Sequence, residues 1–249
     1  NWLNDYINNP NIHSDQIWFR WDSQNEGLIY DQSGIPLQAL TGNGERIHYI
    51  LPKAWFSLNQ PFKFYLEMAC NGMFGNGEPT NPNNYFSLNS CQLVIPNLEC
   101  RALYHDFHEI SDAAREFPSD SWQQHFARKL ANQIMNTFDP DNSDESIVLC
   151  RSLAKTFLGN DIDSSKVFNF KNQLDLKKIP VFNFGNCHID TAWLWPFAES
   201  RRKIVRSWTT QLNLIDSYPE YIFVASQMQQ FKWLKQDQPI IFNKIKENL

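Results

Sequence analysis

The sequence predicts a multidomain α+β protein: an N-terminal antiparallel β-sandwich, a helical linker, and the first βα units of a parallel, barrel-like α/β domain. Three observations predict it. Short β-like runs separated by turn residues fill residues 1–104, helical periodicity occupies 105–173, and strand-like and helix-like segments alternate over 174–249. With 249 residues, of which 42% are apolar, the chain can bury a sizeable core.

The first region, residues 1–104, contains β-like runs bounded by turn material. The clearest runs are 16–21 (QIWFRW), 62–69 (FKFYLEMA) and 91–95 (CQLVI). Glycine, asparagine and proline separate them, most densely over 75–84. Short strands with this punctuation are typical of an antiparallel sandwich.

The second region, residues 105–173, has the period of helices. Trp122, Phe126, Leu130 and Ile134 recur at every fourth position and predict one apolar helix face over 121–135. Residues 139–144 (DPDNSD) interrupt the pattern, and a second helix is predicted over 146–158, ending near Gly159. This region therefore reads as a helical hairpin or linker.

The third region, residues 174–249, alternates two kinds of segment. A buried strand is predicted within 179–184, a helix over 196–217, a second strand over 221–226, and helical segments at 231–234 and 240–245. Strand, helix, strand, helix is the start of a parallel layer. Because two such units cannot close a barrel, we expect the natural protein to continue past Leu249.

Composition and charge argue against nucleic-acid partners, a membrane-spanning segment and an oxidising compartment. The net charge is −5, the pI is about 5.7, and no lysine or arginine run stands out, so nucleic acid is not expected as a partner. Apolar stretches are broken by charge within roughly ten residues, short of the ~20 of a membrane helix. The 5 cysteines form no CxxC pair, and the asparagine-rich chain has no Asn-x-Ser/Thr acceptor, which favours a reducing, cytoplasmic location.

The stretch 179–194 (IPVFNFGNCHIDTAWL) contains the candidate metal site. Side chains two positions apart in an extended segment share a face, so His188 and Asp190 can point at one ion while Ile189 packs the other way. Zinc accepts both donor types, and sites of parallel α/β proteins gather where strands end. A structural His-Asp hydrogen bond is the alternative, and a metal site needs at least one further ligand from elsewhere.

The residues around His188 and Asp190 could have structural or ligand-binding roles. Trp193 and Trp195 could pack in a core or form a floor on which a sugar ring stacks. Cys187 is expected as a buried thiol on the opposite face. The basic residues 201–203 and Arg206 are expected to form a solvated or ion-paired helix face, and the glutamines of 227–230 could reach the same pocket.

The run 185–234 resembles the start of the catalytic domain of glycoside hydrolase family 38, the class II α-mannosidases, and is most similar to the cytosolic and vacuolar branch. Residues 25–30 (NEGLIY) and 67–75 (EMACNGMFG) also resemble the N-terminal β-domain of that branch. On this resemblance the chain is the N-terminal part of such an enzyme. Many relatives have a histidine where this chain has Asn186, which leaves that position with no expected role beyond hydrogen bonding.

The resemblance implies a zinc-dependent, retaining exo-α-mannosidase that releases terminal mannose from free oligosaccharides and glycans. It implies that His188 and Asp190 bind Zn²⁺ and that Trp193 borders the mannose. The nucleophile, the acid/base carboxylate and two further zinc ligands are expected beyond Leu249, so the segment alone is expected to be inactive. A homo-oligomer is also implied, in the cytoplasm, from which delivery to the vacuole or lysosome would need no secretory signal.

Two other functions stay open at this point. One is a different metal-dependent α/β-barrel hydrolase, of the amidohydrolase kind, which also places His-x-acid pairs at strand ends. The other is a non-catalytic, β-rich module for oligomerisation or cargo recognition, with the loop 75–84 as its exposed surface.

Overall fold

The structure, a computed structural model, describes residues 16–42, 46–56, 61–72, 85–160 and 184–248. These residues belong to two compact units. The mixed unit takes in the described residues from 16 to 94 and from 184 to 248, and the helical unit those from 95 to 160. The boundaries at 104/105 and 173/174 remain predictions, and the second of them lies outside the described residues.

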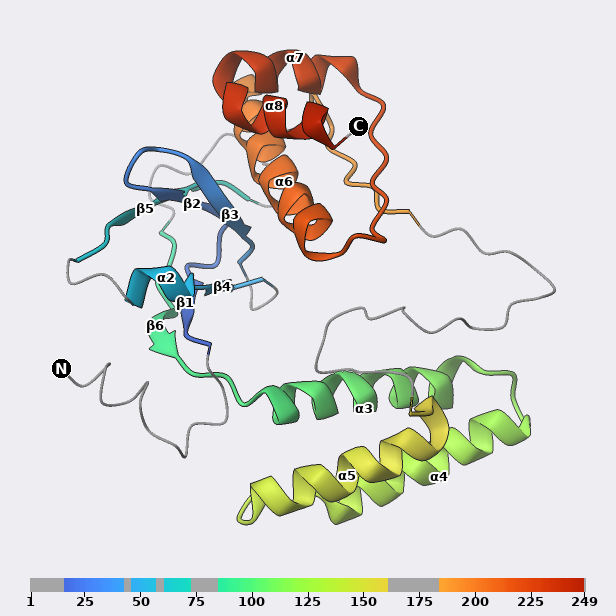
Figure 1. The fold of residues 1–249 in the computed structure, drawn as a ribbon. Helices are drawn as coiled ribbons and strands as arrows, with labels where there is room; N and C mark the ends of the chain where they lie inside the picture. The colour runs from blue at the N-terminus through green and yellow to red at the C-terminus, as the bar shows by residue number, and fades with distance from the viewer. Residues whose placement is uncertain (1–15, 43–45, 57–60, 73–84, 161–183, 249) are drawn as a thin grey trace. The chain divides into compact units, whose positions relative to one another are not determined.

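Two antiparallel three-stranded sheets form the β part of the mixed unit (Figure 1). One has the order β4-β1-β6 and the other β3-β2-β5. Their strands are β1 (Trp18–Asp22), β2 (Gly27–Asp31), β3 (Pro36–Leu40), β4 (His48–Ile50), β5 (Phe64–Met68) and β6 (Ser90–Val94). The sequence located β1, β5 and β6 but not β2, β3, β4 or the short helix α2 (Lys53–Phe56).

Aromatic side chains connect the two sheets. Phe19 of β1 meets Phe64 of β5 edge-on, with ring centroids 5.0 Å apart, and Trp55 of α2 lies 6.2 Å from the same Phe64 ring. The Gln38 amide of β3 donates to the His48 carbonyl of β4 at 2.7 Å. The antiparallel sandwich predicted for this region is therefore present in the described residues.

Three helices complete the mixed unit and confirm the helical periodicity after residue 196. They are α6 (Phe197–Ser217), α7 (Met228–Asp237) and α8 (Pro239–Glu247). Pro196 stands immediately before α6, where a fixed φ and a missing N–H cost nothing. Figure 1 shows α6 running alongside β2 and β3.

One apolar core joins the sheet to these helices. Its buried members are Leu28, Ala39, Ile204, Val205, Trp208, Leu212, Leu234, Ile241 and Ile245. Because β2 and β3 contribute to the same core as α6, α7 and α8, residues almost 200 positions apart in the chain are held as one body.

Within the described residues, the strand pair expected over 179–184 and 221–226 is represented by a single short parallel contact. Gly185 forms an isolated parallel bridge with Phe223, through bonds from Gly185 N to Ile222 O (2.7 Å) and from Val224 N to Gly185 O (2.8 Å). The parallel direction agrees with the prediction. The strand expected within 179–184 falls almost wholly outside the described residues, so a parallel barrel stays a prediction.

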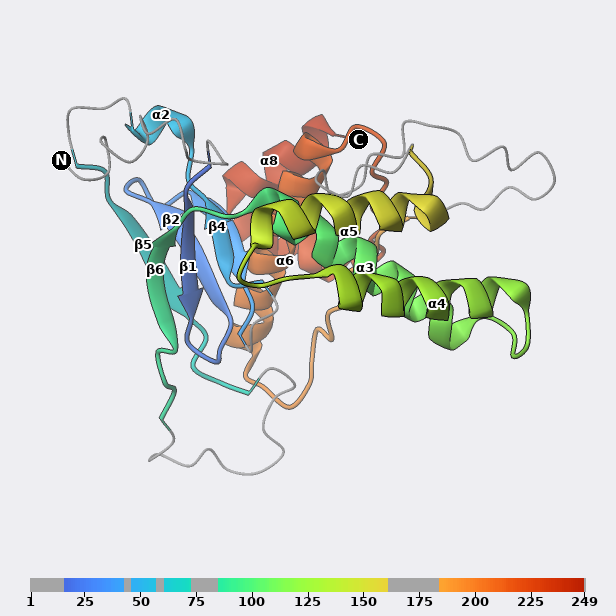
Figure 2. The ribbon, with the colours of Figure 1, turned by 90° about the horizontal axis from the view of Figure 1, so that it is seen from below.

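The helical unit consists of three helices packed side by side (Figure 2). They are α3 (Leu98–Glu116), α4 (Trp122–Thr137) and α5 (Ser143–Leu158). The two helices predicted over 121–135 and 146–158 are confirmed as α4 and α5, and Gly159, at φ 84°, ends α5. Helix α3 begins at Leu98, before residue 105, because Asn97 accepts a bond from Cys100 N and caps it.

Candidate functional site

The segment that carries the His-x-Asp pair is held in place by the residues that follow the Phe223 bridge. The Asn186 amide donates to Val224 O at 3.0 Å, and the Thr191 hydroxyl donates to Gln227 Oε1. Gln230 Nε2 donates both to Ile189 O (3.2 Å) and to Gln227 Oε1 (3.0 Å). Gln227 and Gln230 therefore fix the backbone on which the pair stands.

His188 and Asp190 lie on the same side of this backbone. His188 Nε2 is 3.0 Å from Asp190 Oδ1, and the two side chains are 69% and 43% exposed. Ile189, between them, turns the other way and packs against the core of the mixed unit. Alternation along an extended chain thus presents an imidazole and a carboxylate together to solvent, as the sequence predicted.

The two donors suit a metal ion as well as each other. Two ligand atoms about 2 Å from a tetrahedral zinc ion lie roughly 3.3 Å apart, close to the 3.0 Å seen here. The described residues bring no group of three or more His, Cys, Asp or Glu side chains to any one place. A metal at this pair would therefore need further ligands from outside the described part of the chain.

A cleft of about 490 Å³ opens between the end of β5 and the start of α6. The residues lining it are Ala69, Cys70, Asn71, Trp193, Leu194, Trp195, Pro196, Glu199 and Arg202. Trp193 is 53% exposed and is one of the two tryptophans in this lining. A volume of this size lies in the ~300–1,000 Å³ range of small-molecule sites.

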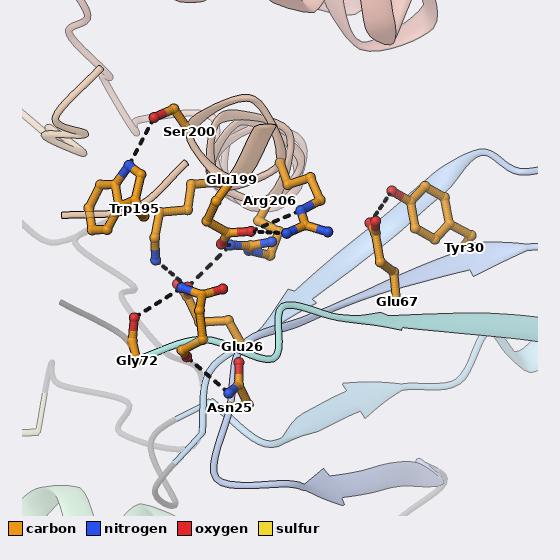
Figure 3. A network of polar contacts seen from close by, with 12 residues as sticks. Asn25, Glu26, Tyr30, Glu67, Gly72, Trp195, Glu199, Ser200 and Arg206 are labelled. Carbon is orange, nitrogen blue, oxygen red and sulfur yellow. Dashed lines mark hydrogen bonds and ion pairs between the residues drawn. The ribbon is translucent and has the colours of Figure 1, made fainter. Parts of the chain in front are cut away.

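A network of buried charges lies beside the cleft (Figure 3). Glu199 of α6 pairs with Arg206 and, at 2.8 Å, with Arg202. Glu26, which precedes β2, pairs with Lys203 and, at 3.2 Å, with Arg206. The side chains of Glu199, Lys203 and Arg206 are only 1%, 5% and 4% exposed, so these ion pairs join the sheet to α6 in a largely dry interface.

The basic residues of α6 were expected to form a solvated or ion-paired face, and the ion-paired form is confirmed. Lys203 and Arg206 are buried and ion-paired, while Arg201 forms an ion pair with Asp237 nearer the surface. Sequence reasoning missed Glu26 and Glu199 as their partners. The spacing of Glu199 to Arg202 (i, i+3) and to Arg206 (i, i+7) is the signal that could have identified Glu199.

The same network fixes Trp195. Its Nε1–H donates to Ser200 Oγ at 2.8 Å, and Lys203 Nζ lies 4.8 Å from the centroid of its ring.

Nearby, the Tyr30 hydroxyl donates to Glu67 Oε2 at 2.9 Å, and burial together with that carboxylate raises the pKa of Tyr30 above its usual range. The Cys187 thiol is half-buried rather than buried as predicted.

Comparison with known proteins gives two family matches and several similar relatives. Residues 2–94 match the alpha-mannosidase jelly roll domain, and residues 178–249 match the N-terminal domain of glycosyl hydrolases family 38. The chain is 50% identical over 239 residues to a Saccharomyces cerevisiae alpha-mannosidase, 33% identical over 238 residues to human alpha-mannosidase 2C1, and 31% identical over 266 residues to alpha-mannosidase G of Dictyostelium discoideum.

These alignments cover 93%, 93% and 100% of this chain. They cover only 21%, 22% and 22% of the three relatives, so the chain spans about a fifth of the length of each. The match to family 38 includes the His188–Asp190 pair and α6, and the jelly roll match includes the two sheets.

Proposed function

Because the chain belongs to glycosyl hydrolase family 38, we propose that the protein is a zinc-dependent, retaining α-mannosidase that removes terminal mannose from free oligosaccharides and glycans. One observation supports this most strongly. Within the matched segment, an exposed His-Asp pair with a separation suited to a metal ion stands five residues or fewer from an exposed tryptophan that lines a cleft. Both matches are named for mannosidases or their family, which favours this function over an amidohydrolase.

His188 and Asp190 would hold the zinc through Nε2 and a carboxylate oxygen, together with ligands from another part of the protein. When bound there, the metal would supply Lewis-acid stabilisation for hydroxyls of the substrate. Trp193 would stack against the apolar face of the mannose ring and orient it. The hydrogen bonds from Gln230 to Ile189 O and from Thr191 to Gln227 would keep the ligand-bearing backbone in position.

In a retaining glycosidase two carboxylates do the bond breaking, one as nucleophile and one as acid and then base. We propose that both carboxylates come from outside the described residues of this chain. The chain's own contribution is binding: it supplies two metal ligands, an aromatic wall, and the backbone that holds them.

Metal analysis and kinetics of the intact protein test the proposal. His188→Ala and Asp190→Asn are expected to lose bound zinc and to lower mannosidase turnover by more than about 100-fold, the upper range for residues that only orient a ligand. Trp193→Ala should raise KM and leave zinc in place. His125→Ala, an exposed helix histidine 61% accessible in the helical unit, is the control and should change neither. Normal zinc and full turnover in either ligand variant would disprove the assignment.

Location and assembly are part of the same proposal. No helix in the described residues is long and apolar enough to cross a membrane. We propose that the protein is a cytoplasmic homo-oligomer that can be delivered to the vacuole. Cell fractionation and light scattering on the purified protein check the two statements separately, and a strictly monomeric protein would refute the second.

A further inference from the structure

The cleft beside Trp193 is built by two parts of the chain that are far apart in sequence. Cys70 and Asn71 follow β5 of the sandwich, whereas Trp195 and Arg202 belong to the segment around the start of α6. The proposed function places the terminal mannose at Trp193 and assigns no ligand to the rest of this lining. What the remaining residues could bind is therefore open.

The lining is chemically suited to a neutral, hydroxyl-rich ligand. Glu199 and Arg202 are its two charged members, and they form an ion pair at 2.8 Å. The rest combines two tryptophan rings, an amide and a few apolar atoms. Aromatic planes with polar groups at their edges suit sugars, which have an apolar ring face and polar rims.

Two polar side chains are placed to bond such a ligand. The Arg202 side chain is 41% exposed and reaches Glu199 through Nε and Nη2, so part of its five-donor guanidinium still faces the cleft. Asn71 Nδ2 bonds only its neighbour's Gly72 carbonyl in the described structure, at 3.0 Å, and its Oδ1 has no donor among the described residues. A ligand hydroxyl that met the Asn71 amide would therefore compete with this one local bond.

The aromatic wall is rigid before any ligand arrives. Trp195 is held by its bond to the fully buried Ser200 hydroxyl and by Lys203 over its ring, and Lys203 is itself held by Glu26 (Figure 3). A wall that is already ordered loses little conformational entropy on binding. The sandwich thus takes part in the cleft both through Asn71 and through the Glu26–Lys203 pair.

We propose that this cleft is a binding site for the sugar unit joined to the terminal mannose, with Trp195 as its wall and Asn71 and Arg202 as specificity-determining residues. The inference rests on the proposed function, which places the terminal mannose at Trp193. Trp193, Trp195 and residues 69–71 line the same cleft, so a second ring attached to a mannose at Trp193 would lie within reach of these residues.

The test compares two substrates in the intact protein: 4-nitrophenyl α-mannoside, which has one sugar, and α-mannobiose, which has two. For Arg202→Gln and Asn71→Ala, the ratio of kcat/KM for the disaccharide to that for the aryl mannoside is expected to fall about tenfold, the effect of losing one or two hydrogen bonds. Arg202→Lys, which keeps a charge for Glu199 but not the forked donors, should lower the ratio by a smaller factor. Arg201→Gln, whose ion pair with Asp237 lies outside the cleft lining, is the matched control and should keep the wild-type ratio.

The outcomes separate the two proposals. If the wild-type protein hydrolyses both substrates and the Arg202 and Asn71 variants keep its ratio, the second sugar site is overturned and the mannosidase stands. If the wild-type protein hydrolyses neither substrate, both the proposed mannosidase function and the second sugar site are refuted. If Arg202→Gln does not fold, Arg202→Lys and Asn71→Ala still decide the question, because neither removes a buried charge.

Discussion

Glu199→Gln should destabilise the mixed unit more than any other charge removal on α6. Glu199 is 1% exposed and accepts from Arg206, also buried, and from the half-exposed Arg202. With Glu199 neutral, Glu26 would be the remaining carboxylate of the network described here, facing Lys203 and Arg206 together. Arg206 Nε already has no hydrogen-bond partner in the described structure, so the loss of the Glu199 carboxylate would leave the Arg206 guanidinium with still fewer acceptors.

The expected loss in the free energy of unfolding depends on which ion pair of Glu199 is buried. Removing one partner of a buried ion pair costs about 3–5 kcal/mol because the other charge remains buried. The Arg202 contact adds no more than about 1 kcal/mol, since water screens that exposed side chain. Glu26 still compensates Arg206 in part, so we expect a loss of about 3 kcal/mol in the free energy of unfolding.

A double-mutant cycle measures the coupling. Urea unfolding followed by the fluorescence of the 9 tryptophans gives the free energies for Glu199→Gln, Arg206→Met and the two together. The double variant should be more stable than Glu199→Gln alone, because it leaves Glu26 and Lys203 as a matched pair and puts an apolar side chain at residue 206. Additive losses, with the double variant the least stable of the three, would refute this account of the network.

Two further predictions concern backbone positions. Gly185→Ala should lower the free energy of unfolding by about 1–3 kcal/mol, because the new Cβ would lie 2.0 Å from Tyr221 Oη and 2.6 Å from Tyr221 Cζ, so the ring must move. Thermal or urea unfolding measures this loss. Adding Tyr221→Leu should recover part of the lost stability, and no recovery would argue against the clash. Ser121→Ala should cost about 1 kcal/mol by removing the cap that accepts from Gln124 N at 3.2 Å. The control for the second is Ser152→Ala, at an exposed position inside α5, which should not destabilise the protein; equal losses in both would contradict the capping role.

Local pattern predicted most of the helices and the orientation of the metal-ligand candidates. Helices α4, α5 and α6 follow from apolar spacing and from end signals such as Pro196 and Gly159, because a helix is stabilised by contacts within a few residues. The pair His188 and Asp190 shares a face for an equally local reason, the alternation of an extended chain. Neither inference needs to know what lies across the fold.

Strands β2, β3 and β4 were not predicted because they are short and their residues do not alternate cleanly. Strand β2 has a buried start, Gly27-Leu28-Ile29, since it is the central strand of its sheet and is covered by α6 on one face. A strand's pattern depends on what packs on each face, which the chain does not record locally.

The sequence by itself determined that a histidine and an aspartate would emerge together after residue 187, with a tryptophan close behind, because these relations span only a few covalent steps. Only the tertiary structure decided that Glu26 pairs with Lys203 and Arg206 some 180 residues later, and that Asn71 shares a cleft with Trp193 and Arg202. Charges and polar groups so distant in the chain meet only because burial of one shared apolar core brings β2, β3 and α6 together, and that core is set by the whole fold.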